Sequence, residues 1–316
     1  MVGKSNTDVL KDAMRNLYHS SSGRFISGAP NRGRVALFKS LKLPFGVDVC
    51  GLMGFGATLT HVVTLHHHFS RAKLDVKISA SNPLYTNLAN PDLLDAYFVR
   101  ADTSIKPRHN IRYRFYQDLA STHPGEGLTV EKAHDLFFSN YTIKKIYVDD
   151  AKNIHSLIGG PALGIHFRGS DKFIEARRIA WDEIVSAARK ALSYFGLSKL
   201  FVASDEIEFI AHMRLEFGSE NVYALDAKHF AQGGVGAHFS GGDPLEMGRE
   251  ALVTMLALSM CMACIRGSSH LSAWSKLMNP KLPVIMLNES QSSSAVFPEG
   301  EIRAESHKRF GHQFGF

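Results

Sequence analysis

The sequence has few cysteines and no long apolar run. Its 316 residues include 3 Cys and 2 Trp. Three cysteines do not make the disulfide framework that is typical of small secreted domains. No apolar run approaches the ~20 residues that a membrane-spanning helix needs, and residues 1–24 contain no continuous apolar core of a secretory signal. These absences predict a cytoplasmic protein.

The charge balance is mildly basic, with 36 Lys and Arg against 30 Asp and Glu, or +6. Such an excess suits a protein that handles anionic small molecules or works near an anionic membrane surface. The basic residues are scattered and form no tract interleaved with aromatic residues, so we expect no nucleic acid partner. The sequence also lacks a G-x-S-x-G nucleophile elbow and a complete G-x-G-x-x-G turn, which disfavours a serine hydrolase and a nicotinamide cofactor.

Apolar strands alternate with amphipathic helices after a polar, irregular stretch of about 40 residues. In the first half, strands are predicted at 47–52, 74–79 and 143–150, and helices at 57–72, 90–97 and 129–141. In the second half, strands are predicted at 162–167, 199–204, 221–225, 262–267 and 283–287, and helices at 172–195, 206–217, 244–260 and 270–278. This alternation predicts parallel sheets covered by helices on both faces. We therefore expect an α/β protein with two doubly wound, Rossmann-like domains facing a cleft, at residues 1–155 and 156–316.

Charged residues crowd at the end of the apolar strand 162–167, in the stretch HFRGSDK. In parallel sheets, ligands bind beyond the carboxyl ends of the strands. Arg168 can hold a phosphate through two parallel hydrogen bonds, and a helix start behind it would add backbone amides. Asp171 is interpreted either as a helix cap or as a group that orients Arg168. A plain charged surface turn is the alternative for the whole cluster.

Two further strand ends carry similar chemistry. Ser204 and Asp205 follow the strand 199–204, and the serine-rich stretch GSSHLS follows the strand 262–267. Hydroxyl groups and free amides at a helix start suit phosphate oxygens, although each group could instead be a helix cap. Three strand ends with the same chemistry predict a ligand that contains phosphate.

Four stretches of the chain carry a family resemblance. GIHFRGSDKFIEA, LFVASDEIEFIAHMRLEFG and LALSMCMACIRGSSHLSAW resemble the three signature motifs of the superfamily of α1,2-, α1,6- and protein O-fucosyltransferases. GFGATLTHVV resembles the glycine turn and helix of the α1,6 enzymes, which include the rhizobial nodulation fucosyltransferases. The resemblance implies a GT-B fold and an inverting transfer without a metal. It also implies that the C-terminal domain holds GDP-fucose, with no other cofactor.

The resemblance also implies roles for individual residues. The implied donor-binding residues are His166, Arg168, Lys172, Ser204, Asp205, Glu250, Thr254, Ser268, Ser269 and Ser272. The implied acceptor-side residues are Gly54, Gly56 and His61. Arg168 is expected to stabilise the charge of the leaving diphosphate, and a carboxylate is expected to take the proton of the acceptor hydroxyl. We prefer Glu175 for this base, because Asp171 is better placed to hold Arg168 or Lys172.

The sequence departs from the family pattern at several positions, and these departures keep other hypotheses open. Gly169 replaces an arginine, and Thr254 replaces the aspartate that reads guanine, with Glu250 one turn earlier as a substitute. One alternative is therefore a glycosyltransferase with another nucleotide sugar, and a second is a non-catalytic nucleotide-sugar-binding protein. A phosphate-handling hydrolase ranks last. The acceptor is an oligosaccharide, a lipid-linked glycan or a protein hydroxyl, and peripheral contact with the inner membrane face stays open.

Overall fold

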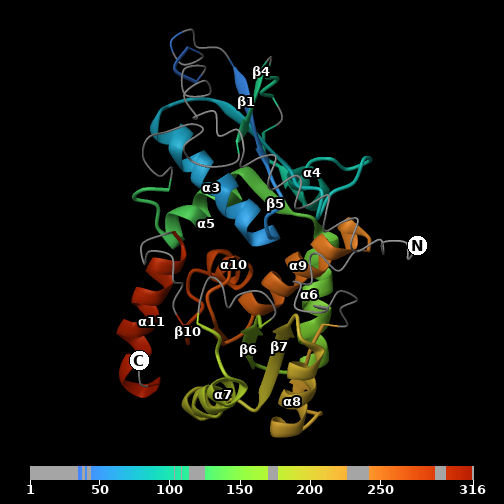
Figure 1. Cartoon of the computed structure of the whole chain (residues 1–316), viewed down its shortest axis with the longest axis vertical. Coiled ribbons are helices and arrows are strands. Elements are labelled where there is room, and N and C mark those ends of the chain that lie inside the picture. The colour runs from blue at the N-terminus through green and yellow to red at the C-terminus, as the bar shows by residue number, and fades with distance from the viewer. Residues whose placement is uncertain are drawn as a thin grey trace, which may run out of the picture.

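The chain forms two α/β units, each built on a parallel sheet (Figure 1). The computed structural model describes residues 35–37, 40, 44–102, 104–107, 109–113, 125–169, 177–225, 242–288 and 297–314. Within these ranges, no helix is both long and apolar enough to cross a membrane.

The first unit contains a three-stranded parallel sheet in the order β2-β1-β4. Its strands are β1 (Phe45–Cys50), β2 (Val76–Ser81) and β4 (His109–Tyr113). A glycine turn after β1 leads into the long helix α3 (Phe55–Arg71), which packs on the sheet. The unit also contains α4 (Leu93–Tyr97), α5 (Val130–Asn140) and the antiparallel pair β3 (Phe98–Arg100) and β5 (Tyr141–Ile143).

The second unit contains a five-stranded parallel sheet in the order β10-β9-β6-β7-β8. Its strands are β6 (Ala162–Phe167), β7 (Lys199–Ser204), β8 (Val222–Tyr223), β9 (Ala263–Arg266) and β10 (Val284–Met286). Strands β6, β7 and β8 lie side by side in chain order. The next strand, β9, lies on the other side of β6. Such a reversal leaves a crevice at the carboxyl ends of the two central strands, where doubly wound sheets bind ligands.

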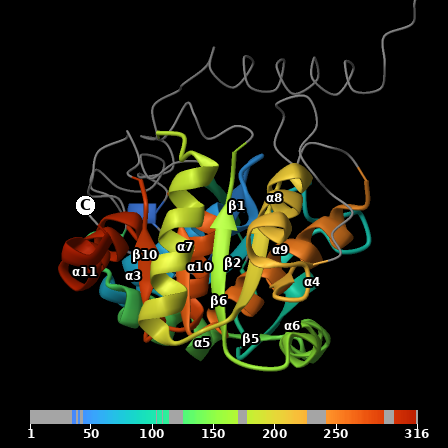
Figure 2. The same cartoon turned by 90° about the horizontal axis from the view of Figure 1, so that it is seen from below.

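Helices cover both faces of this second sheet. The helices α7 (Trp181–Phe195) and α8 (Ile207–Phe217) lie on the outer face, away from the first unit (Figures 1 and 2). The helices α9 (Pro244–Ser259) and α10 (His270–Met278) lie between the two sheets (Figure 1). The last helix, α11 (Glu299–Phe314), packs beside β10. Because β6 is covered on both faces, all six of its residues are buried.

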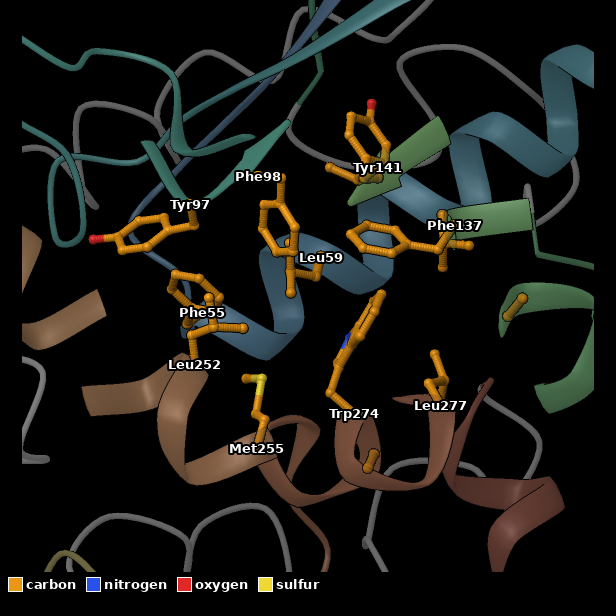
Figure 3. Close-up of a cluster of buried hydrophobic side chains, with 14 of the residues drawn as sticks. Phe55, Leu59, Tyr97, Phe98, Phe137, Tyr141, Leu252, Met255, Trp274 and Leu277 are labelled. Atoms are coloured by element: carbon orange, nitrogen blue, oxygen red, sulfur yellow. The ribbon is translucent and has the colours of Figure 1, made fainter. Parts of the chain in front are cut away.

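A single hydrophobic core joins the two units (Figure 3). Phe55 and Leu59 of α3 lie in the same buried cluster as Met255 of α9 and Trp274 of α10. The Trp274 indole also donates a hydrogen bond of 2.9 Å to the Thr60 hydroxyl of α3. The contact between the units is therefore a packed helix–helix interface around α3 and α10.

The predicted domain boundary between residues 155 and 156 falls inside the helix α6 (Lys145–Ile158). This helix packs on α9, where Arg249 bonds to Asp150 at 2.8 Å and the His155 ring bonds to the Ala257 carbonyl at 2.8 Å. Helix α6 therefore belongs to the packing of both units. The division into two domains stays a prediction.

The fold class is confirmed, but the strand predicted at 143–150 is wrong. Strand β5 ends at Ile143, and α6 begins at Lys145. The apolar residues that pack inward are Tyr147, Ala151, Ile154 and Ile158. They recur every three or four residues, which is the spacing of a helix face, and the pattern becomes clear only beyond residue 150.

The start predicted for the next helix is also wrong. The segment 177–180 is not helical, and α7 begins at Trp181 rather than near residue 172. The Glu183 carboxylate accepts a hydrogen bond of 3.1 Å from the Ala180 amide, which caps the first turn of α7. The segment before Trp181 is therefore available to approach the ends of the strands.

Candidate functional site

A pocket opens at the carboxyl ends of β6 and β9, where the strand order reverses. It is a shallow pocket that is partly open to solvent. Its lining comes from residues 166–169 at the end of β6 and just beyond it, 177–179 before α7, 267–269 after β9, and Asn288 after β10. The pocket therefore occupies the position at which a doubly wound sheet binds its ligand.

The lining of this pocket is basic. Arg168, Arg177, Arg178 and His166 all contribute to it, and no carboxylate lies among the lining residues that the structure describes. Guanidinium groups bind phosphate and carboxylate through paired hydrogen bonds, and a concave surface strengthens their field. The arrangement suits a small anion or the anionic part of a larger ligand.

The end of β6 is tied to the turn after β7. His166 is buried near the end of β6, and Arg168 follows the strand. The Gly169 amide donates a hydrogen bond of 3.2 Å to the Asp205 carboxylate. The Ser204 hydroxyl accepts one of 3.0 Å from the Glu206 amide. Ser204 and Asp205 therefore shape this turn and do not line the pocket itself.

Glu206 occupies the space beside Gly169. A side chain at position 169 would overlap the Glu206 carboxylate and the Phe167 ring. One Glu206 oxygen also lies 3.5 Å from the Arg178 guanidinium. Burial raises the pKa of Glu206, and the neighbouring Arg178 works in the opposite direction. Among the residues that the structure describes, Glu206 is the carboxylate that contacts Arg178 at the rim of the basic pocket.

The turn after β9 is held by two side chains from the C-terminal part of the chain. The Ser268 amide donates to the Asn288 side-chain oxygen at 2.7 Å, and the Ser269 amide donates to the Glu299 carboxylate at 3.1 Å. These two amides are not free, contrary to the prediction for this helix start. Ser268 and Ser269 nevertheless both line the pocket.

Behind this turn lies a buried ion pair. The Arg266 side chain is 0% exposed and donates to Glu299 at 2.5 Å. It also donates to the Ser272 hydroxyl at 2.9 Å and to the Ser269 carbonyl at 2.6 Å. Buried charges are stable when they are paired and hydrogen-bonded in this way. The Ser272 hydroxyl thus belongs to a network under the pocket floor.

The other predicted donor residues lie elsewhere. Glu250 and Thr254 are on α9 and do not line the pocket, and Glu250 is buried. Asp171, Lys172 and Glu175 lie outside the described residues. Their roles stay predictions.

The predicted acceptor-side residues are all on or next to α3. Gly54 precedes the helix, with open space where a side chain would lie. Gly56 faces the first turn of α10 so closely that a methyl group would lie 2.5 Å from the His270 carbonyl oxygen. The His61 ring lies 3.3 Å from the Tyr113 hydroxyl. Gly56 thus has a packing role, and the acceptor role of all three residues stays a prediction.

Arg177, Arg178 and Asn288 also line the pocket, although the sequence motifs do not single them out. The predicted helix 172–195 placed both arginines in a helix interior, where they would have been ordinary surface residues. Acidic residues favour the first turn of a helix, so Asp182 and Glu183 were a signal for a later start. Asn288 had no comparable signal, because its contacts come from distant parts of the chain.

Comparison with solved structures identifies the fold. The NodZ α1,6-fucosyltransferase co-crystallised with GDP has a TM-score of 0.54 and 17% sequence identity to the chain. NodZ soaked with GDP-fucose has a TM-score of 0.52 and 16% identity, and NodZ from Bradyrhizobium has 0.54 and 16%. Each match covers 77% of this chain and 95% of the other. The chain has the GT-B fold of these fucosyltransferases.

This likeness confirms, at the level of the fold, the resemblance that the motifs predicted. No protein-family model and no curated protein sequence matches the chain. Across the described parts of the chain, no group of three or more His, Cys, Asp and Glu side chains could hold a metal ion.

Proposed function

We propose that the protein is a glycosyltransferase that transfers fucose from GDP-fucose to a hydroxyl of a glycan or glycoconjugate. The observation that carries the proposal is the basic pocket at the switch point between β6 and β9. It lies in a chain with the fold of fucosyltransferases that were crystallised with GDP and with GDP-fucose. The free thiols of its three cysteines also suit a reducing compartment, the cytoplasm.

The chemistry of the pocket supports this choice. Breaking the bond between the sugar carbon and the nucleoside diphosphate builds negative charge on the leaving phosphate. Arg168 lies directly after β6 and lines the pocket, so it is placed to stabilise that charge. We assign the diphosphate to this pocket, with His166 and Ser268 as further contacts. This assignment needs no metal ion.

Inversion at the sugar carbon requires an acceptor hydroxyl on the opposite side from the diphosphate, with a base to take its proton. Glu175 is the proposed base, with Asp171 as the alternative. Gly54 and His61 mark the proposed acceptor side. The acceptor class remains an oligosaccharide, a lipid-linked glycan or a protein hydroxyl.

A second candidate is transfer from a different nucleotide sugar. Two observations favour it: Glu206 fills the space beside Gly169, and neither Glu250 nor Thr254 of α9 lines the pocket. Both features concern how the donor is held rather than how it reacts. The second candidate uses the same pocket and the same Arg168. It differs from the first in the nucleobase of the donor, which the binding experiment identifies.

The test is direct binding of GDP, UDP, GDP-fucose and GDP-mannose to the full chain, by calorimetry in the presence of EDTA. We expect GDP-fucose to bind, and Arg168→Ala to weaken binding by about 10- to 100-fold through loss of charge-assisted hydrogen bonds. Arg189→Ala is the control, because Arg189 lies on α7 in an exposed pair with Glu216.

The outcomes separate the candidates. Preference for GDP-fucose, together with weaker binding in Arg168→Ala, would support the proposal, and release of GDP in an acceptor screen would then identify the reaction. Preference for another nucleotide sugar would favour the second candidate. Absence of nucleotide binding would contradict both, and binding without transfer or hydrolysis would favour a non-catalytic protein.

A further inference from the structure

Two arginines of the pocket, Arg177 and Arg178, differ in how firmly they are held. Arg177 makes two hydrogen bonds to the Glu183 carboxylate, at 2.8 and 2.9 Å, and a third to the Leu287 carbonyl at 3.3 Å. The paired bonds to Glu183 raise the pKa of Arg177 and lower that of Glu183. The Arg177 guanidinium therefore already forms hydrogen bonds within the protein.

Arg178 is held only loosely. Its side chain is 59% exposed, and its contact with Glu206 is a single nitrogen–oxygen approach of 3.5 Å. Exposed ion pairs with this geometry contribute little, because water screens the charges and the long side chain loses freedom. The Arg178 guanidinium is thus able to leave Glu206 when a stronger anion arrives.

The backbone on both sides of Arg178 is fixed. Ile179 is buried in the outer hydrophobic cluster of the second sheet. On the other side, the Arg177 carbonyl accepts a hydrogen bond of 2.6 Å from Asn288. Arg178 therefore presents an exposed, weakly paired side chain from an anchored stretch of backbone that lines the pocket.

We propose that Arg178 is a second anion-binding guanidinium of this pocket, and that it exchanges Glu206 for the diphosphate of the nucleotide. The inference rests on the proposed function for the identity of the ligand. A diphosphate offers Arg178 paired, charge-assisted hydrogen bonds in place of one long contact. Arg178 and Arg168 would then approach the diphosphate from two different segments of the chain.

Glu206 has a defined part in this exchange. Its side chain is only 16% exposed, and it lies against Gly169 at the edge of the pocket. Glu206 is the partner of Arg178 in the structure, so it competes with a ligand for the guanidinium. Removal of its charge should therefore tighten anion binding, and this gain should depend on Arg178.

The experiment is a double-mutant cycle with Arg178→Ala, Glu206→Gln and the double variant, with GDP and inorganic pyrophosphate as separate probes in calorimetry. We expect Arg178→Ala to weaken binding of both probes by about 10- to 100-fold. Glu206→Gln should tighten binding by about 2- to 5-fold, the size of an exposed ion pair. In the double variant, this gain should disappear.

Guanosine and Arg189→Ala serve as controls. Binding of guanosine, which has no phosphate, should not change in Arg178→Ala, whereas a general loss of structure would weaken it. Arg189 matches Arg178 in exposure, at 57% against 59%, and also pairs with a glutamate. Its replacement should leave the binding of every probe unchanged, and the melting temperature of each variant confirms that it is folded.

Failure of this inference is distinct from failure of the proposed function. Unchanged GDP and pyrophosphate binding in Arg178→Ala, with normal binding by the wild type, would overturn the role of Arg178 and leave the proposed function intact. Arg178-dependent binding of pyrophosphate without GDP binding would contradict the proposed function but support the anion site. An equal gain from Glu206→Gln with and without Arg178 would overturn the exchange.

Discussion

A single methyl group at Gly56 would test how tightly the two units are joined. A Cβ atom there would lie 2.5 Å from the His270 carbonyl oxygen, 2.6 Å from its carbonyl carbon and 2.8 Å from the Leu271 amide nitrogen. All three are backbone atoms at the start of α10, so none can rotate away. An unstrained contact between carbon atoms needs about 3.5 Å, and α3 and α10 would therefore have to separate by about 1 Å.

The expected cost of Gly56→Ala follows from this geometry. Forcing an extra methyl group into a packed interface costs about 1–3 kcal/mol. The separation would also stretch the 2.9 Å bond between Trp274 and Thr60, which adds about 1 kcal/mol. We expect the free energy of unfolding to fall by about 2–4 kcal/mol in total. In a chain of 316 residues the melting temperature should drop by about 3–6 °C.

Circular dichroism during heating and urea titration would measure the loss, with Gly54→Ala as the matched control. Gly54 has φ −59° and nothing within 4 Å of an added Cβ, so alanine fits there without strain. Its replacement should cost no more than about 1 kcal/mol, the usual effect at an N-cap. If Gly56→Ala melted with the wild type, the packing argument would be wrong. A selective loss of transfer would then favour the predicted acceptor role of Gly56.

Two further predictions concern the floor of the pocket. Arg266→Met should lower the free energy of unfolding by about 3–5 kcal/mol, because Glu299, whose side chain is only 14% exposed, would lose its charged partner. Arg189→Met should cost less than about 1 kcal/mol, because that ion pair is exposed. Urea titration of both variants tests this difference, and equal losses would contradict it. Asn288→Ala should leave the Ser268 amide without its acceptor and weaken GDP binding while the protein stays folded. Unchanged calorimetric affinity would show that Asn288 does not position the turn.

The alternation of strands and helices in the second unit was predictable because its sheet is covered on both faces. Strands in such a sheet are continuous apolar runs, and β6 is buried along its whole length. The predicted strand 199–204 and helix 270–278 coincide with β7 and α10. The order of the strands could not be read in the same way, because pairing depends on contacts between distant segments.

The sequence does not predict helices α6 and α11, because their patterns of apolar residues are weak or misleading. Helix α11 was not predicted because it buries only Ile302, Ser306 and Phe310, and one of these is polar. In α6, the exposed apolar residue Ile146 precedes the buried stripe and follows β5 closely, so it extends the apolar pattern of the strand. Periodicity reports which residues are buried, so an element that buries little leaves little signal.

The candidate site was predictable as a place but not as a set of contacts. The strand ends that carry His166, Arg168 and Ser268 do meet at one pocket. Arg178 reaches the same pocket only because α7 starts later than its sequence suggests. The partner of the Ser268 amide, Asn288, lies 20 residues further along the chain. Such pairings follow from the packed fold and not from any local pattern.

The serine-rich stretch after β9 illustrates why one motif can serve two purposes. The Ser272 hydroxyl accepts a hydrogen bond from Arg266 at 2.9 Å and lies 3.3 Å from the Ser269 carbonyl, to which it donates. Direct contact between Ser272 and a sugar nucleotide would require this buried network to open, which would leave the buried Nε–H group of Arg266 without its acceptor. Ser268, one turn earlier, lines the pocket and has no such constraint on its side chain in the described contacts. The same residue type thus lies in a buried network at one position and lines the pocket at another, and the hydrogen bond from Arg266 marks the buried one.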